Sequence, residues 1–546
     1  MRVLVLGIVA ACGVQPHSVG TQPSWRHGDP GETGTVVAPV VFAPAEEPAR
    51  SYNEPLQAPP PSPLGDAVTA AVRDAAAPLH LPPPVADARL FRACAELAEI
   101  VPEDGIVGYG LVEFALQRNG IIEPSPHLLV VWGTIDKPDA IVQEIRPRLA
   151  EILGDGMTAR LGVGAAKRKP DGTGAVVFAL QASGVATSPM PRALPAGGSF
   201  GIDAVIDARY REPEVFVTHD DGATDKLPLV LGAAGGVRAQ VACGGHHGRQ
   251  QVEIAASDTA GSTVLANFPV WCGGEPPLSV TIDPPRSDEA PVSADEAERR
   301  LLALVNRDRQ AAGLPALLWD ERVAAVARAH SEEMRRTKVV EHISPTTGSA
   351  ADRVRAANIH TGVVLENVAR AYGVTEAHEG LMNSPGHRAN MMSTQATHIG
   401  IGVVLGDEVS GRRELFLTQV FIRVPPKVDP ARTADLVRAR IATVRPVAVD
   451  AQLQSIAQGV ADGLAVGKTR DQMWPDARKR LDKLGARYTR VGSVVTAVAD
   501  LDALDGKELV GDYKPDDIGV GIAQGTHPEI GENAIFIVVL MAERVK

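Results

Sequence analysis

Two histidines and one glutamate are the residues of this chain best suited to chemistry, and they lie within one stretch of it. His342 lies in "EHISP", Glu366 in "LENVA" and His387 in "SPGHRAN". A neutral imidazole can bind a metal ion or accept a proton, and a carboxylate can do the same. If folding brings the three together, they suit a weakly held divalent cation such as Zn²⁺, or the polar floor of a ligand cleft.

The surroundings of these residues differ. Glu366 lies in the apolar run "VVLENVA", where burying a carboxylate without a partner is costly, so we expect a basic or metal partner. His330 falls on the apolar stripe of a helical pattern, which indicates a buried structural histidine. For His342, in a loop before Ser-Pro, a functional role and a structural turn both remain open.

The stretch "SPGHRAN" places His387 directly after a Pro-Gly turn. Free backbone N–H groups and the imidazole can face a cleft there. Arg388 and Asn390 are expected to hold this loop through hydrogen bonds. The candidate cleft residues in this part of the chain are His342, Glu366, Asn367, His387 and Arg388.

Composition narrows the class of protein. The chain has 546 residues, which suggests about three or four domains. Hydrophobic residues make up 45% but aromatic ones only 4%, so the cores must be built from Ala, Val, Leu and Ile. The net charge of −12 and the absence of a dense Lys/Arg stripe argue against nucleic acid as a partner.

The first residues, "MRVLVLGIVAAC", read as an export signal that covers residues 1–12. Their ending resembles a bacterial lipobox, in which Cys12 would be lipidated and would attach the protein to a membrane. The alternative is a cleavable signal with an incidental cysteine. No other stretch approaches the roughly 20 apolar residues of a membrane span. We therefore expect an exported protein, either a cell-envelope lipoprotein or a secreted one.

Residues 13–80 are rich in Pro, Gly, Ser and Ala, which predicts a disordered spacer. Residues 195–280 contain short alternating runs separated by turns, which predicts a small β-sandwich. Cys243 and Cys272 lie in similar strand-like contexts, and in an oxidising compartment we expect them to form a disulfide. His246 and His247 follow in "CGGHHGR", where an exposed turn is favoured over a metal site. Cys94 is expected to be a buried free thiol.

Three later stretches look alike: residues 160–181, 398–419 and 517–540 each contain Gly-Val/Ile-Gly, a polar hairpin and a second apolar run. A helical pattern opening at Asp87, Asp320 or Asp450 precedes each. We interpret them as three copies of one α/β unit, with chance resemblance as the alternative. No GxGxxG is present, so the glycines indicate close backbone approach or a bulge rather than a dinucleotide site.

The order of motifs from about Glu296 to Val424 resembles the CAP superfamily of cysteine-rich secretory, antigen 5 and pathogenesis-related proteins, in its bacterial SCP-like branch. The resemblance implies an α/β fold, with a three-layer α-β-α sandwich at residues 294–425. Residues 81–190 and 430–546 would then be degenerate copies of it, with Leu149 and Gly506 at the place of His387.

In that family, two histidines and two acids line a cleft that binds a divalent ion in some members. His342, Glu366 and His387 match three of these four residues, so the resemblance implies that these three are the metal ligands. In the run "GLMNS", Ser384 stands near the place of the second acid, and Glu379 is close in sequence. This departure leaves the four-residue set incomplete.

The function expected from the sequence is binding of a small ligand, a lipid or a cell-envelope component in this cleft. One alternative is a structural or adhesive surface protein, which the spacer, the β-sandwich and the two flanking units favour. Another is a metal-dependent hydrolase of envelope polymer or peptide, with Glu366 as ligand or general base. No GxSxG, HExxH or cysteine-nucleophile signature occurs, so an enzyme is the less favoured interpretation.

Overall fold

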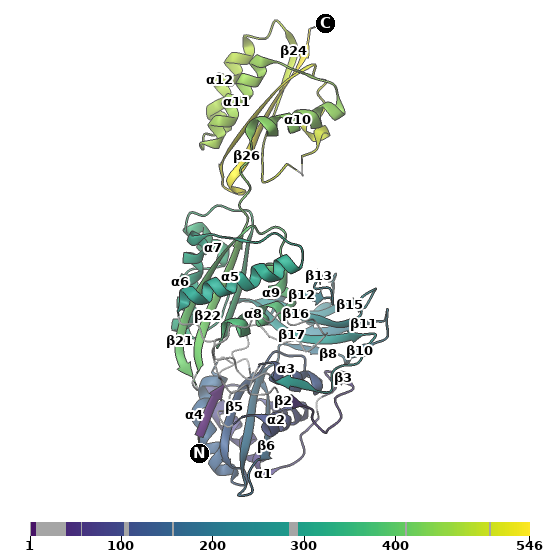
Figure 1. Ribbon diagram of the computed structural model, residues 1–546, viewed down its shortest axis with the longest axis vertical. Helices are drawn as coiled ribbons and strands as arrows, with labels where there is room; N and C mark the ends of the chain where they lie inside the picture. The colour runs from purple at the N-terminus through teal and green to yellow at the C-terminus, as the bar shows by residue number, and fades with distance from the viewer. Residues whose placement is uncertain are drawn as a thin grey trace, which may run out of the picture.

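The computed structural model describes residues 2–6, 40–55, 57–102, 109–154, 158–282, 293–409, 412–501 and 504–545. Figure 1 shows an α/β unit near the N-terminus, a β-sandwich beside it, a central α/β unit and a further α/β unit at the C-terminal end. We call the three α/β parts the first, central and third units. Among the described residues, no helix combines the length and apolar character needed to cross a bilayer.

The central unit has three layers, as predicted. Its sheet has the order β19-β21-β22-β20, and helices cover both faces. One face packs against α6 and α7, and the other against α5, α8 and α9. Its elements are α5 (Ala294–Ala311), β19 (Leu318–Trp319), α6 (Glu321–Thr337), α7 (Ala350–Ala356), β20 (Val364–Ala371), α8 (Val374–Asn383), α9 (Pro385–Met391), β21 (His398–Val409) and β22 (Arg412–Ile422).

The sheets of the three units share one strand arrangement. In each, a short strand pairs in parallel with the first strand of a long hairpin, and a third long strand pairs antiparallel with the second. In the first unit these strands are β4 (Val85–Ala86), β6 (Thr158–Lys167), β7 (Thr173–Ala182) and β5 (His127–Thr134); in the third they are β23 (Ala448–Val449), β25 (Asp517–His527), β26 (Gly531–Arg544) and β24 (Tyr488–Val498).

Helices lie on both faces of the flanking sheets as well. The first unit has α1 (Pro63–Ala76) and α4 (Pro138–Leu153) on one face and α2 (Ala88–Ile100) and α3 (Tyr109–Arg118) on the other. The third has α10 (Pro430–Val444) and α13 (Gly506–Val510) opposite α11 (Ala451–Ala465) and α12 (Arg470–Asp482). The aspartates Asp87, Asp320 and Asp450 are the N-caps of α2, α6 and α11. Cys94, on α2, is a buried free thiol, as expected.

The Gly-x-Gly pairs let a helix lie directly on each sheet. A Cβ atom at Gly402 would lie 2.1 Å from the backbone nitrogen of Arg328 on α6. Gly164 and Gly521 approach the backbones of α2 and α11 in the same way. The prediction of close backbone approach is therefore confirmed in all three units.

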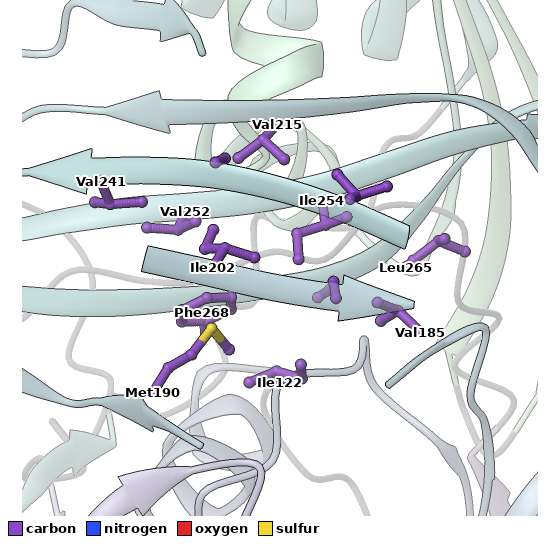
Figure 2. Packing of buried hydrophobic residues seen from close by; sticks show 14 of the residues in the cluster. Ile122, Val185, Met190, Ile202, Val215, Val241, Val252, Ile254, Leu265 and Phe268 are labelled. Atoms are coloured by element: carbon purple, nitrogen blue, oxygen red, sulfur yellow. The ribbon is translucent and has the colours of Figure 1, made fainter. Parts of the chain in front are cut away.

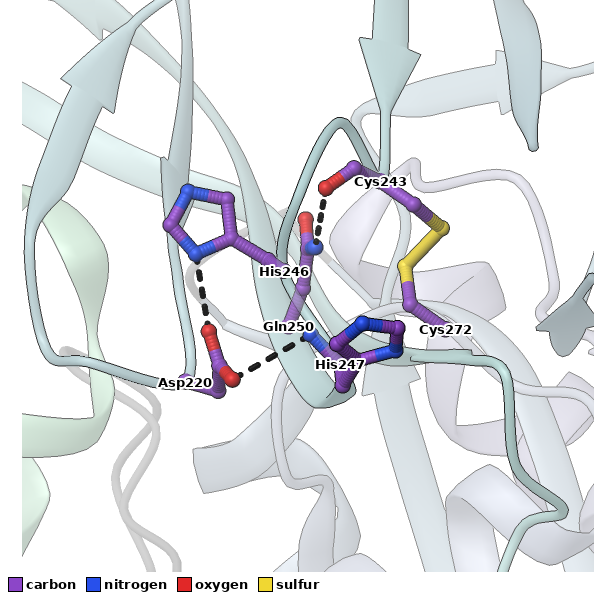
Figure 3. The surroundings of a disulfide bond; sticks show 6 residues. All are labelled: Asp220, Cys243, His246, His247, Gln250 and Cys272. Carbon is purple, nitrogen blue, oxygen red and sulfur yellow. Dashed lines mark hydrogen bonds and ion pairs between the residues drawn. A yellow bond between two sulfur atoms is a disulfide. The ribbon is translucent and has the colours of Figure 1, made fainter. Parts of the chain in front are cut away.

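The β-sandwich consists of two sheets that enclose a core of aliphatic and aromatic side chains (Figure 2). One sheet has the order β10-β17-β16-β12-β13 and the other β14-β15-β11-β8. The bounds are β8 (Val185–Thr187), β10 (Ala193–Leu194), β11 (Ser199–Ile206), β12 (Arg211–Thr218), β13 (Thr224–Lys226), β14 (Val230–Leu231), β15 (Gly236–Ala242), β16 (Gly248–Asp258) and β17 (Gly261–Cys272). The predicted disulfide between Cys243 and Cys272 is present (Figure 3).

The prediction of a disordered spacer over residues 13–80 is wrong for its described part. Residues 40–42 form β2 (Val40–Phe42), which pairs with β18 (Val280–Ile282), and β3 (Ser51–Tyr52) pairs with β9 (Met190–Pro191). Val68 and Val72 on α1 are completely buried against the first unit. Their helical spacing supplies the apolar face that the Pro-rich composition concealed.

The start of the β-sandwich and the pairing of the N-terminal residues also differ from expectation. The β-sandwich begins before residue 195, because β8 belongs to it. At the N-terminus, the backbone of β1 (Arg2–Leu6) pairs antiparallel with β5. Cys12, the expected lipidation site, lies outside the described residues, so the signal at residues 1–12 stays a prediction.

We predict that Gly402→Ala destabilises the central unit by about 1–3 kcal/mol, because the new methyl group would press on the backbone of α6. The measurement is the midpoint of thermal or urea unfolding. Gly201→Ala on β11 is the matched control, since its Cβ would meet only the flexible side chain of Gln240 at 3.7 Å. Equal effects of the two substitutions would contradict the packing argument.

Candidate functional site

Glu366 lies at the centre of the predicted cleft and has two basic partners. Its Oε2 accepts a hydrogen bond from Nδ1 of His342 at 3.0 Å, and its Oε1 forms an ion pair with Arg353 on α7. Loss of water by itself would raise the pKa of Glu366, but the hydrogen bond from His342 and the positive charge of Arg353 outweigh it and lower that pKa. The basic partner predicted for Glu366 is therefore present, and it is Arg353, which sequence reasoning missed.

His387 lies on the first turn of α9 and its ring is buried. The rings of His342 and His387 are nearly parallel, with centroids 6.5 Å apart. Burial, followed by the charge of His342, lowers the pKa of His387 to about 3, so this imidazole is neutral at physiological pH. The structure thus brings His342, Glu366 and His387 together, and we call these three residues the polar centre.

An amide network fixes the loop around His387. Asn367 donates to the backbone oxygen of His387 at 3.1 Å and to the side chain of Gln419. Asn390 donates to the backbone oxygen of Glu366 and to the side-chain oxygen of Asn367. Asn367 is fully buried and so holds the loop rather than facing a ligand.

A carboxyl group from the β-sandwich lies directly against this loop. Glu253 on β16 accepts a hydrogen bond from Ser384 and another from the backbone nitrogen of Gly386 at 2.9 Å. Ser384 in turn contacts Nδ1 of His387 at 2.6 Å. The Ser384 hydroxyl therefore links the Glu253 carboxyl group to the imidazole of His387. Glu253, Ser384 and His387 therefore form one chain of hydrogen bonds between the two domains.

Further contacts dock the β-sandwich on the same side of the central unit. The backbone nitrogens of His342 and Ile343 both donate to the oxygen of Ala260, at the β16–β17 turn. Nε of Arg388 donates to the backbone oxygen of Gly222 in the β-sandwich at 2.9 Å. Arg388 was expected to hold the loop around His387, and in the structure it also links the two domains. As a result His387 is only 8% exposed, whereas the His342 side chain keeps 21% exposure. The polar centre is covered on the His387 side and reachable beside His342.

His330 is buried, as predicted, with Nε2 bonded to the backbone oxygen of Glu341 at 2.8 Å. The sequence did not indicate a role for Glu253, because this residue precedes the central unit in the chain and belongs to the β-sandwich. The only sequence signal for it was an acid within the alternating run "QQVEIAAS", at a position that the strand buries.

In the described arrangement, the three residues of the polar centre are engaged by other protein groups. A cation there would have to compete with Arg353 for Glu366 and with Ser384 for His387. The described residues contain another group that could hold a metal ion: Asp220, Asp221 and His246. The ligand atoms of these three side chains lie within 4.8 Å of one another. It lies on exposed β-sandwich turns, where His246 bonds to Asp220 at 2.8 Å (Figure 3).

Comparison with known proteins identifies the central unit. The profile of the cysteine-rich secretory protein (CAP) family matches residues 302–421. Residues 302–421 are a CAP domain. The chain is 37% identical over 116 residues to an uncharacterized protein, YkwD, of Bacillus subtilis, and 37% identical over 108 residues to an uncharacterized membrane protein, YlbC, of the same organism. These matches cover 21% and 20% of this chain but only 45% and 31% of the two relatives.

Two solved structures are similar to parts of the chain. One is an extracellular protein containing an SCP domain from Bacillus anthracis, with 25% identity, a TM-score of 0.22, and coverage of 33% of this chain and 60% of the other. The second is a cysteine-rich secretory protein from Staphylococcus aureus, with 13% identity, a TM-score of 0.20, and coverage of 41% and 76%. TM-scores this low add nothing to the assignment, which rests on the family profile and the curated relatives.

We predict that Glu253 makes the docking of the β-sandwich on the CAP domain dependent on pH. Burial raises the pKa of Glu253 from 4.5 to about 7. Because the pKa of Glu253 is higher in the folded protein, its protonation contributes to the free energy of unfolding. This contribution is complete below about pH 4.5 and is lost as the pH rises to about 7. Glu253→Gln cannot ionise, so it should gain on the order of 3 kcal/mol relative to the native chain between these pH values.

The measurement is the unfolding free energy of the transition that includes the β-sandwich, at several pH values between 4.5 and 7.5. Asp203→Asn is the matched control, because its side chain is 61% exposed on β11. Parallel pH profiles for the native chain and Glu253→Gln would show that Glu253 is not the titrating group.

Proposed function

We propose that this protein is exported and that its CAP domain binds a small polar ligand or cell-envelope component at the polar centre. The observation that carries the proposal is the convergence of His342, Glu366 and His387 beside the partly exposed ring of His342. A carboxylate and two imidazoles, one of them neutral, can exchange hydrogen bonds with hydroxyl and amide groups of a ligand.

The size of the ligand is limited by the β-sandwich. Its contacts with Ser384, Gly386 and Arg388 cover the side of the centre where His387 lies. A lipid chain or a polymer would require these contacts to open, whereas a small ligand needs only the approach beside His342. The geometry therefore favours a small molecule, or the end of a larger envelope component, over an enclosed lipid.

Export is supported by two independent features. The signal-like residues 1–12 and the disulfide between Cys243 and Cys272 both suit an oxidising compartment outside the cytoplasm. Membrane attachment through a lipidated Cys12 belongs to the same proposal.

The second candidate is a structural or adhesive surface protein, and the shared strand arrangement of the three units favours it. We propose that the first and third units are copies of the CAP fold without its polar centre. Leu149 is buried on α4, and Gly506 begins the short helix α13, at the places where sequence spacing puts His387. Hydrolysis is less favoured, because Glu366 is already engaged by His342 and Arg353 and no nucleophile has been identified.

The binding proposal predicts a saturable interaction that depends on the polar centre. We expect soluble peptidoglycan fragments to bind the full chain, and His342→Ala and Glu366→Gln each to weaken binding at least about tenfold, or about 1.4 kcal/mol. Isothermal calorimetry is the measurement. His247→Ala, an exposed residue on a β-sandwich turn, is the matched control.

Two outcomes would contradict this. Binding that survives both substitutions would place the ligand elsewhere on the chain. If neither these fragments nor phospholipid vesicles bind, while the protein adheres to isolated envelopes, the surface-protein candidate takes precedence.

Zinc binding at the CAP domain stays a prediction, and we expect it to be weak because Glu366 would have to leave Arg353. A Zn²⁺ titration of the full chain tests this with His387→Ala and His246→Ala as a pair. Loss of binding with His387→Ala alone supports an ion at the polar centre. Loss with His246→Ala alone contradicts it and places the ion at Asp220, Asp221 and His246.

A further inference from the structure

A cavity of about 70 Å³ lies where the first unit meets the β-sandwich, away from the CAP domain. By the same measure a single water needs roughly 10–15 Å³, so this space can hold a small ligand. Its wall is formed by α3, β17, β18 and the segments around β3 and β9. Phe114, Pro269 and Trp271 make the wall partly apolar.

Three arginines line this cavity, and two of them are already engaged. Arg118 forms an ion pair with Glu96 at 3.2 Å and donates to the backbone oxygen of Pro44. Arg249 donates to Gln251 at 2.6 Å and lies in the field of Glu113. Loss of water lowers the pKa of Arg249 to about 10, so it still carries its charge at neutral pH. Acids lie near both arginines, so the positive character of the cavity wall depends on the third arginine.

Arg192 is the arginine whose charge is not balanced. It is 7% exposed and donates from Nη1 to the backbone oxygen of Ala49 at 2.9 Å. Within the described residues, no carboxylate lies within ion-pair distance of it, and its buried Nε has no hydrogen-bond partner. The edge formed by Nε and Nη2 is the one that binds carboxylates and phosphates in a bidentate manner.

Tyr52 adds a second donor without a partner. The guanidinium of Arg192 lies over its ring at 5.7 Å, and its fully buried hydroxyl has no hydrogen-bond partner in the described part of the chain. Burial raises the pKa of Tyr52, although the charge of Arg192 and a side-chain interaction of its guanidinium with the phenol lower that pKa, so the phenol keeps its proton. Buried polar groups without hydrogen-bond partners are unfavourable, and a ligand oxygen would satisfy both Arg192 and Tyr52.

We propose that this cavity is a binding site for a small oxyanion, a carboxylate or phosphate group, held by Arg192 and Tyr52. The charge of Arg192 selects a negative group, and Phe114 and Trp271 accommodate a small apolar body attached to it.

The test uses the full chain and three anions: inorganic phosphate, acetate and benzoate. Binding is measured by calorimetry at constant ionic strength with chloride as the reference anion. We expect saturable binding of at least one of them; tighter binding of benzoate than of acetate would assign the site to a carboxylate on an apolar body, and preference for phosphate would assign it to a phosphate group.

The variants separate a specific site from general charge. Arg192→Gln should weaken binding at least tenfold, whereas Arg238→Gln, which removes an equal charge from a side chain 72% exposed on β15, should leave it unchanged. Tyr52→Phe should weaken binding without lowering the melting temperature of the anion-free protein, because it removes only the unpartnered hydroxyl.

The proposal is overturned if none of the three anions binds saturably, or if Arg192→Gln and Arg238→Gln weaken binding equally. Tyr52→Phe keeps the test decisive if Arg192→Gln fails to fold, since full affinity in Tyr52→Phe would also overturn it. His342→Ala should not change anion binding, which keeps this result independent of the function proposed for the CAP domain.

Discussion

The docking of the β-sandwich on the CAP domain is the contact on which the character of the polar centre depends. Glu253, on β16, accepts hydrogen bonds from Ser384 and from the backbone nitrogen of Gly386, and Ser384 is also hydrogen-bonded to His387. Because this chain of hydrogen bonds is buried, the imidazole of His387 is kept neutral and its side of the centre is closed. Without the β-sandwich, the same loop would present an open histidine to solvent.

Charge balance explains how an acid can lie inside this domain. Glu366 is 8% exposed, which would be unfavourable for a lone carboxylate, but Arg353 and His342 contact its two oxygens. This pairing stabilises the ionised carboxylate without a metal ion. A ligand that enters beside His342 therefore meets a site whose charges are already compensated, which suits recognition through hydrogen bonds more than through net charge.

Among the described residues, the β-sandwich contacts the first unit and the CAP domain, and a proposed site lies at each of these contacts. Against the CAP domain it closes the polar centre, and against the first unit it forms the cavity lined by Arg192 and Tyr52. The three units themselves share one way of packing a helix on a sheet, in which paired glycines such as Gly400 and Gly402 leave room for the helix backbone. Their common architecture therefore comes from backbone packing, while their possible functions differ with the side chains at their edges.

The sequence by itself determined the local features of this protein: the aspartate caps, the close approach at the glycine pairs, the cysteine pair and the three residues of the polar centre. Each of these depends on residue type and spacing within one segment, or on a family pattern. It could not reveal Glu253 beside Ser384, Arg353 beside Glu366 or the fold of residues 40–80, because these depend on contacts between segments distant in the chain. Only the packing of the β-sandwich on the CAP domain determines which side of the polar centre is exposed to solvent. The burial of a residue depends on all the surfaces packed against it, and the sequence of one segment does not contain this information.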